Sequence, residues 1–257
     1  MINNPRLMSS QPIQGRLFEW PDKAELVKSR MSAISYLKGK EKETRRRKLT
    51  CGNLHLSKDM EFTAELEMPI VKPYDGSIPP DLIGFNELSC QRYRAGVHFF
   101  LDDYSFSRLW NGLDRYTPVL AKYRCVIAPD YSFYVDMSKQ VNLQSLYKNN
   151  FVSAYWQNVG IQVIPTVSWG NVDSFEYCFD GKPKHSVLAI GAVGMSRNKW
   201  AIELFEYGIS QTIERLQPTA LMIYGTSIKL RGLSVPVYYY EDFINSKFRS
   251  HGRSTIL

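Results

Sequence analysis

Short hydrophobic runs alternate with longer amphipathic stretches over the C-terminal two thirds of the chain. Seven runs of four to seven residues have the near-continuous apolar composition of strands buried on both faces: 82–85, 97–101, 125–128, 161–167, 186–190, 220–224 and 235–239. Between them, apolar residues recur at helical spacing over 105–123, 137–159, 172–179 and 198–216. Strands that alternate with helices are typical of a parallel sheet covered by helices.

This pattern predicts an α/β fold with one parallel sheet of six to seven strands and flanking helices. The sheet is either a partial β/α barrel or an open doubly wound sheet. The barrel is favoured because no glycine-rich dinucleotide fingerprint marks a first strand-to-helix turn. Before the sheet, residues 24–37 predict a short helix and residues 49–84 a proline-rich loop region. We therefore predict a basic, partly flexible N-terminal segment over 1–48 and a single α/β domain over 49–257.

Positive charge is concentrated in the N-terminal quarter. Residues 1–60 contain 13 Lys and Arg against 6 Asp and Glu, whereas residues 61–257 contain 19 of each. The densest tract includes Lys42, Arg45, Arg46, Arg47 and Lys48. Such an asymmetry predicts either a basic arm that binds nucleic acid or a solvated leader without a partner.

Polar residues follow the predicted strands at their carboxyl ends, where ligands bind in both candidate folds. The candidates for substrate binding or catalysis are Asp102, Asp103, Tyr104, Asp130, Ser132, Ser168, Trp169, Arg197, Tyr224 and Glu241. Asp102, Asp103 and Asp130 come from neighbouring units of the pattern, so we expect them to converge. Shared carboxylates either divide into acid and base roles or bind Mg²⁺ or Mn²⁺, with Asp102 and Asp130 as metal ligands. The alternative is that they cap the helices that follow.

The other candidates have a structural alternative as well. Trp169 either stacks on a base or sugar beside Ser168 or belongs to the core. Arg197 follows the Gly191–Gly194 stretch and leads into a predicted helix, which suits a phosphate, although the sequence is not a Walker A loop.

Several other chemistries are disfavoured. The four cysteines are far apart and show no C-x-x-C spacing, and no H-E-x-x-H or G-x-S-x-G motif is present. His98 lies inside a predicted strand and is expected in the core. The chain shows no apolar signal region and no apolar stretch of transmembrane length, so we expect a cytoplasmic protein with no membrane partner.

Several blocks, taken in order, resemble a known family. They are 56–62, 97–104, 129–132, 155–157, 160–169, 178–181 and 223–225. Together they resemble domain of unknown function 4417, a family of phage, prophage and plasmid proteins, over roughly residues 50–240. The resemblance implies a mobile-element setting, and therefore the cytoplasm of a bacterial host, but it implies no reaction.

Three functions remain open at this point. The first is an enzyme with a carboxylate pocket, metal-assisted or not, that acts on a nucleotide or nucleic acid; if it is a hydrolase, its substrate contains phosphate. The second is a non-catalytic nucleic-acid-binding accessory protein in replication. The third is a binder that sequesters a signalling nucleotide during host–phage conflict. The sequence does not determine the oligomeric state.

Overall fold

The structure is a computed structural model that describes residues 51–193, 199–225 and 230–241. The chain divides into two units, Met1–Leu54 and His55–Leu257, and nearly all of the described residues belong to the second. The predicted helix at 24–37 and the predicted boundary after residue 48 lie outside the described residues and stay predictions. Among the described helices, none has both the length and the apolar composition to cross a membrane.

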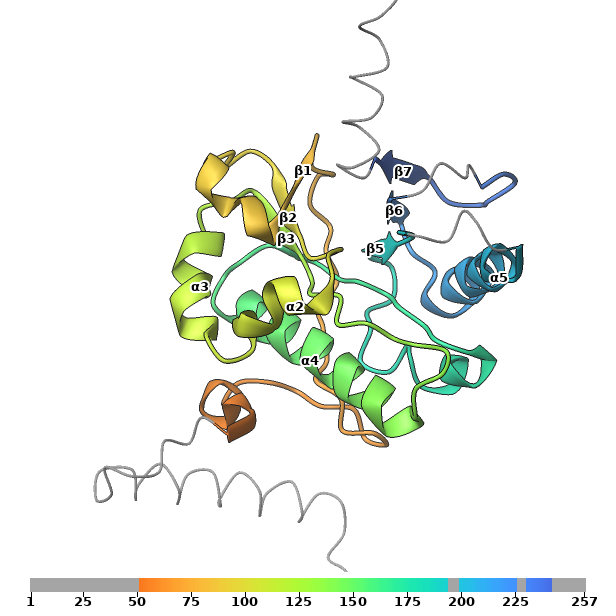
Figure 1. The fold of residues 1–257 in the computed structure, drawn as a ribbon, viewed down its shortest axis with the longest axis horizontal. Coiled ribbons are helices and arrows are strands. Elements are labelled where there is room, and N and C mark those ends of the chain that lie inside the picture. The colour runs from red at the N-terminus through yellow and green to blue at the C-terminus, as the bar shows by residue number, and fades with distance from the viewer. Residues whose placement is uncertain (1–50, 194–198, 226–229, 242–257) are drawn as a thin grey trace, which may run out of the picture. The chain divides into compact units, whose positions relative to one another are not determined.

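All seven predicted strands are present, and several are shorter than the hydrophobic runs that predict them. They are β1 (Leu82–Gly84), β2 (Gly96–His98), β3 (Cys125–Ile127), β4 (Val163–Ile164), β5 (Val187–Gly191), β6 (Ala220–Tyr224) and β7 (Val237–Tyr240). Every pairing between them is parallel. The strands form two sheets, one with the order β1-β2-β3-β4 and one with the order β5-β6-β7 (Figure 1).

The prediction of one sheet with six to seven strands is therefore wrong, because the ladder breaks between β4 and β5. In the described residues the two sheets share a single parallel bridge, between Thr166 and Ala189. A longer ladder would need the amide of residue 165 to donate to the Val187 carbonyl, but Pro165 has no N–H. In a longer ladder the Val187 amide would donate to the Val163 carbonyl. In the structure this amide donates to the Tyr74 carbonyl, at 3.1 Å. A proline thus ends the first sheet.

The two sheets nevertheless enclose a common core. Alternate residues on their inner faces belong to one hydrophobic cluster: Cys125, Ile127, Ile164, Val187, Ala189, Ala220, Met222 and Tyr224. The Tyr240 hydroxyl, at the end of β7, donates to the Pro79 carbonyl before β1 at 2.6 Å. Neither sheet has the reversal of strand order that a doubly wound fold requires. The structure thus shows a mixed α/β fold with two parallel sheets, each in consecutive strand order.

Two of the four predicted helices are confirmed almost residue for residue. Helix α4 (Lys139–Asn158) corresponds to the prediction at 137–159, and α5 (Lys199–Leu216) to the prediction at 198–216. Helix α4 is followed by Gly160 with φ +89°, in the left-handed region that glycine favours after a helix C-terminus.

The other two predicted helices are shorter or broken. The stretch 105–123 divides into α2 (Asp103–Phe106), the 3₁₀ turn η3 (Ser107–Leu109) and α3 (Leu113–Leu120). The break falls at Asn111-Gly112, a turn dipeptide that favours ending a helix. The stretch 172–179 forms only the 3₁₀ turn η4 (Val172–Glu176). Two further 3₁₀ segments are η1 (Cys51–Leu56) and η2 (Phe85–Cys90).

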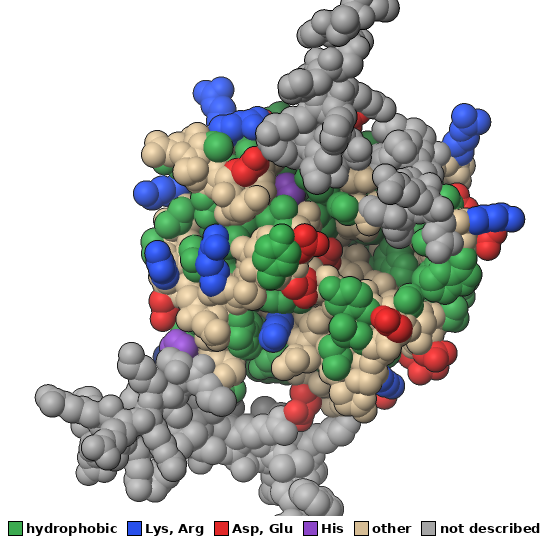
Figure 2. Space-filling view, viewed as in Figure 1, with side chains coloured by type: hydrophobic (Ala, Val, Ile, Leu, Met, Phe, Trp, Pro, Cys, Tyr) green, Lys and Arg blue, Asp and Glu red, His purple; other side chains and the backbone are tan. Residues whose placement is uncertain are grey.

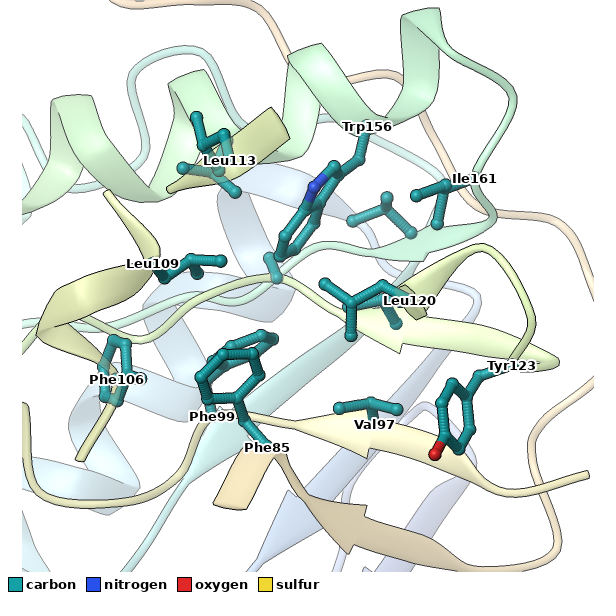
Figure 3. Close-up of a cluster of buried hydrophobic side chains, with 14 of the residues drawn as sticks. Phe85, Val97, Phe99, Phe106, Leu109, Leu113, Leu120, Tyr123, Trp156 and Ile161 are labelled. Atoms are coloured by element: carbon teal, nitrogen blue, oxygen red, sulfur yellow. The ribbon is translucent and has the colours of Figure 1, made fainter. Parts of the chain in front are cut away.

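Helices cover the outer face of each sheet. The outer residues of the first sheet pack against α2, α3 and α4 around Trp156, which is fully buried, with its ring 5.8 Å from that of Phe99 (Figure 3). The outer residues of β5 and β6 pack against α5 through Phe205 and Ile209. These clusters hold the loops at the carboxyl ends of the strands on a rigid base.

Candidate functional site

A cavity of about 200 Å³ opens at the carboxyl ends of β3, β4 and β5. Its lining comes from the end of β5, from the segments that follow these three strands and from one side chain of α5: Asp130, Ser132, Phe133, Val167, Ser168, Trp169, Ile190, Gly191, Val193 and Phe205. Four of the predicted site residues are among them. Figure 2 shows acidic side chains gathered near the centre of one face, with exposed hydrophobic side chains around them.

Asp130 contributes the carboxylate found in the described lining of this cavity, and it is half-buried. Its Oδ1 atom accepts a hydrogen bond from the Ser168 hydroxyl. Its Oδ2 atom accepts no hydrogen bond from the described residues and would lie 3.1 Å from a Cβ added to Gly191. The glycine on β5 thus leaves room for this oxygen beside the strand.

Burial disfavours the charged form of Asp130 and raises the pKa of this carboxyl to about 6. The neighbouring negative charge of Asp103 acts in the same direction. The Ser168 hydrogen bond and the positive charge of Lys182 oppose the rise. A carboxyl group with a pKa near 6 exchanges its proton close to neutral pH, as an acid–base catalyst must.

Lys182 is the charged partner that sequence reasoning missed. It lies in the loop between η4 and β5 and is half-buried. Burial lowers the pKa of its ammonium group to about 8, while the nearby groups of Asp130 and Cys178 oppose this change. No sequence pattern marks Lys182, because its proximity to Asp130 depends on the path that the loop between η4 and β5 takes in the folded protein.

The other two predicted carboxylates have different environments. Asp103, in the first turn of α2, accepts hydrogen bonds from the Ser132 amide at 3.2 Å and the Ser132 hydroxyl at 2.8 Å. It therefore links α2 to the loop after β3. Asp102 is exposed, does not line the cavity and makes no side-chain capping bond to α2. Within the described residues, no group of three or more His, Cys, Asp or Glu side chains is placed to hold a metal ion.

Two buried asparagines on α4 hold the loop that carries Asp130. The Asn149 amide accepts from the Tyr131 N–H at 2.8 Å and donates to the Tyr131 carbonyl at 3.2 Å. Asn142 makes the same pair of bonds with the main chain of Tyr134, at 3.2 and 3.1 Å. These bonds pair backbone N–H and carbonyl groups of a loop that belongs to no sheet. They therefore fix the positions of the cavity residues between Tyr131 and Tyr134.

Trp169 lines the cavity and also packs into the core. Its indole lies against α5 where Gly208 has no side chain, since a Cβ there would be 2.1 Å from the ring. Its ring centroid is 5.9 Å from that of Phe205 and 6.0 Å from that of Phe175. Both sequence interpretations, binding wall and core residue, are therefore compatible with its position.

The remaining predicted site residues lie elsewhere. Tyr224 is buried in the inner cluster, with its ring 4.2 Å from that of His98, and does not line the cavity. His98 is buried, as expected, and burial lowers the pKa of its imidazole to about 3, so it is neutral. Tyr104 is 79% exposed and Glu241 is also exposed. Arg197 and the basic tract 42–48 lie outside the described residues.

The geometry defines an α/β protein with a carboxylate-containing cavity at the carboxyl ends of parallel strands. The chain belongs to the family described as Domain of unknown function (DUF4417), whose model matches residues 60–238. The predicted family resemblance is thus confirmed.

The chain is similar to two mycobacteriophage proteins, each called Gene 1 protein. It is 36% identical to that of Mycobacterium phage L5 and 32% identical to that of Mycobacterium phage D29, each over 176 residues. These matches cover 67% of this chain, 76% of the L5 protein and 65% of the D29 protein. No solved structure matches the chain significantly.

Proposed function

We propose that this protein is an enzyme that acts on a nucleotide or nucleic acid, with Asp130 as its acid–base group. The observation that carries the proposal is the half-buried Asp130 carboxylate in the strand-end cavity, with one oxygen held by Ser168 and the other without a donor among the described residues. Ligands of parallel α/β proteins bind at this edge of the sheet.

The walls of the cavity support a ligand with a flat aromatic ring. Phe133, Trp169 and Phe205 contribute aromatic surface, and Ser132 and Ser168 contribute hydroxyl groups to the described lining. Among the described residues, the lining contains no Lys or Arg. A nucleobase fits this composition better than a phosphate does, so the sugar and phosphate would extend out of the cavity.

The proposal is tested by incubating the wild-type protein with a mixture of nucleotides and short oligonucleotides, with and without Mg²⁺ or Mn²⁺, and analysing the products by mass spectrometry. Asp130→Asn should abolish any turnover. Asp102→Asn is the matched control, because it makes the same substitution at an exposed carboxylate outside the cavity, and it should leave turnover unchanged. Turnover that survives Asp130→Asn refutes the proposed role.

The metal-assisted form of the enzyme is a separate proposal. Mg²⁺ binds proteins through as few as one or two carboxylates, and Asp130 and Asp103 are close enough for the charge of one to raise the pKa of the other. Dependence of turnover on Mn²⁺ or Mg²⁺, lost on chelation, would support it. Hydrolysis of a phosphate-containing substrate likewise stays a prediction for the same product assay.

Nucleic-acid binding by the basic segment is a second candidate, supported by the concentration of positive charge in residues 1–60. Phosphate contacts of this kind give binding that weakens steeply with salt. Replacing Arg45, Arg46 and Arg47 by Gln should reduce affinity for a duplex of any sequence and flatten its salt dependence. Unchanged affinity, measured by fluorescence anisotropy, would exclude this segment as the binding site.

A further inference from the structure

We propose that the cavity selects guanine among the nucleobases, through two parallel hydrogen bonds from the base to the Asp130 carboxylate. This inference rests on the proposed function for the location of the site and adds the class of base. It follows from the size of the cavity, the acceptors in its lining and the donor pattern of each base.

The size of the cavity fits one base. Its volume of about 200 Å³ is below the range of roughly 300–1,000 Å³ found for sites that enclose a drug-sized ligand. One fused ring system matches the space better than a whole nucleotide does. Its aromatic lining, Phe133, Trp169 and Phe205, provides apolar surface for the faces of such a ring.

The carboxylate determines which base edge fits. An ionised Asp has two oxygens that accept hydrogen bonds and no donor. Guanine presents two adjacent donors on its pairing edge, the ring N1–H and the exocyclic 2-amino group. Adenine and cytosine place an acceptor nitrogen beside their amino group, and uracil and thymine flank a single N–H with two carbonyls. Each of these would place an acceptor against the charged oxygens of Asp130.

The surroundings of Asp130 leave it available for this contact. Ser168 occupies one position on Oδ1, which retains a second lone pair, and Oδ2 has no donor among the described residues. Because Gly191 has no side chain, Oδ2 lies close beside β5 without a steric clash. Two ligand N–H groups would compensate the desolvation of the charged oxygens, which otherwise raises the pKa of this carboxyl to about 6.

The experiment is isothermal titration of the full-length protein with guanosine, inosine, adenosine and cytidine at pH 7.5. Guanosine should bind most tightly. Inosine lacks the 2-amino group, and losing one hydrogen bond to a charged group should weaken binding at least about tenfold. Guanosine affinity should also fall as the pH drops below 6, because protonated Asp130 has one acceptor fewer.

Asp130→Asn provides the sharpest test. Its amide offers one acceptor and one donor, a combination that matches adenine, so the preference for guanosine over adenosine should be lost or reversed. Asp102→Asn should retain the wild-type order. Equal binding of the four nucleosides, no binding, or an unchanged preference in Asp130→Asn would each overturn the inference.

The inference and the proposed function fail separately. Guanosine binding that depends on Asp130, without turnover of any guanine nucleotide, supports the inference and refutes the enzyme. Turnover that depends on Asp130, without preference for guanine, supports the enzyme and overturns the inference.

Discussion

Replacing Asp130 by Asn should stabilise the protein at neutral pH. The pKa of this carboxyl rises from 3.8 to about 6 on folding, mainly because burial disfavours its charge. Each pKa unit corresponds to about 1.36 kcal/mol, so holding Asp130 ionised costs about 3 kcal/mol of folding free energy. This is an upper limit, since water in the open cavity screens the half-buried group. The asparagine keeps the shape of the side chain without the charge.

The sign of the effect depends on pH. Because the folded pKa is raised, the folded state holds the proton more tightly, and the contribution of Asp130 to stability falls as the pH rises from about 4 to about 6. Asp130→Asn should therefore match the wild type near pH 4 and exceed it by up to about 3 kcal/mol above pH 6. For a domain of this size, that gain corresponds to a rise in Tm of roughly 6–12 °C.

The assay is urea unfolding followed by circular dichroism at pH 4 and pH 7.5, with Asp102→Asn as the control for removing an exposed carboxylate. A variant that is less stable than the wild type at pH 7.5, or whose gain does not change with pH, would refute the reasoning. A confirmed gain would mean that the protein sacrifices stability to keep a charged oxygen in the cavity, as functional sites often do.

Three further substitutions test the support of the site. Asn149→Ala removes two hydrogen bonds to the buried backbone of the loop and should lower the free energy of unfolding by about 3 kcal/mol. The control Gln144→Ala, on the exposed face of α4, should lower it by less than about 0.5 kcal/mol. Equal losses in urea unfolding would contradict the role of Asn149. Gly208→Ala places a Cβ 2.1 Å from the Trp169 ring and should cost about 1–3 kcal/mol, with a shift in tryptophan fluorescence; an unchanged spectrum and stability would show that the indole is not fixed there. Trp156→Ala empties a fully buried site and should cost about 3–5 kcal/mol, so a loss below 1 kcal/mol would mean that the core closes around it.

Sequence reasoning located the edge of the fold where the cavity lies. Asp130 and Ser168 were found because each follows a hydrophobic run, and the carboxyl ends of neighbouring parallel strands share one edge. The same rule also selected Tyr104, which lies on the exposed surface. Tyr224, the last residue of its run, lies in the inner core. Position after a strand therefore predicts the edge, but the direction of a side chain depends on the loop that carries it.

Local sequence determined the elements of this protein. Apolar runs fixed all seven strands, apolar periodicity fixed α4 and α5, and Gly160 marked the end of α4, because each signal acts within a few residues of the chain. The tertiary structure decided what distant segments do together. The division into two sheets depends on Pro165, which cannot donate to the Val187 carbonyl, and on Tyr74, whose carbonyl accepts the Val187 amide. The proton affinity of Asp130 depends on its burial, on the Ser168 hydrogen bond and on Lys182, which lies 52 positions along the chain. Both are long-range contacts, whose energies arise only after the chain has folded.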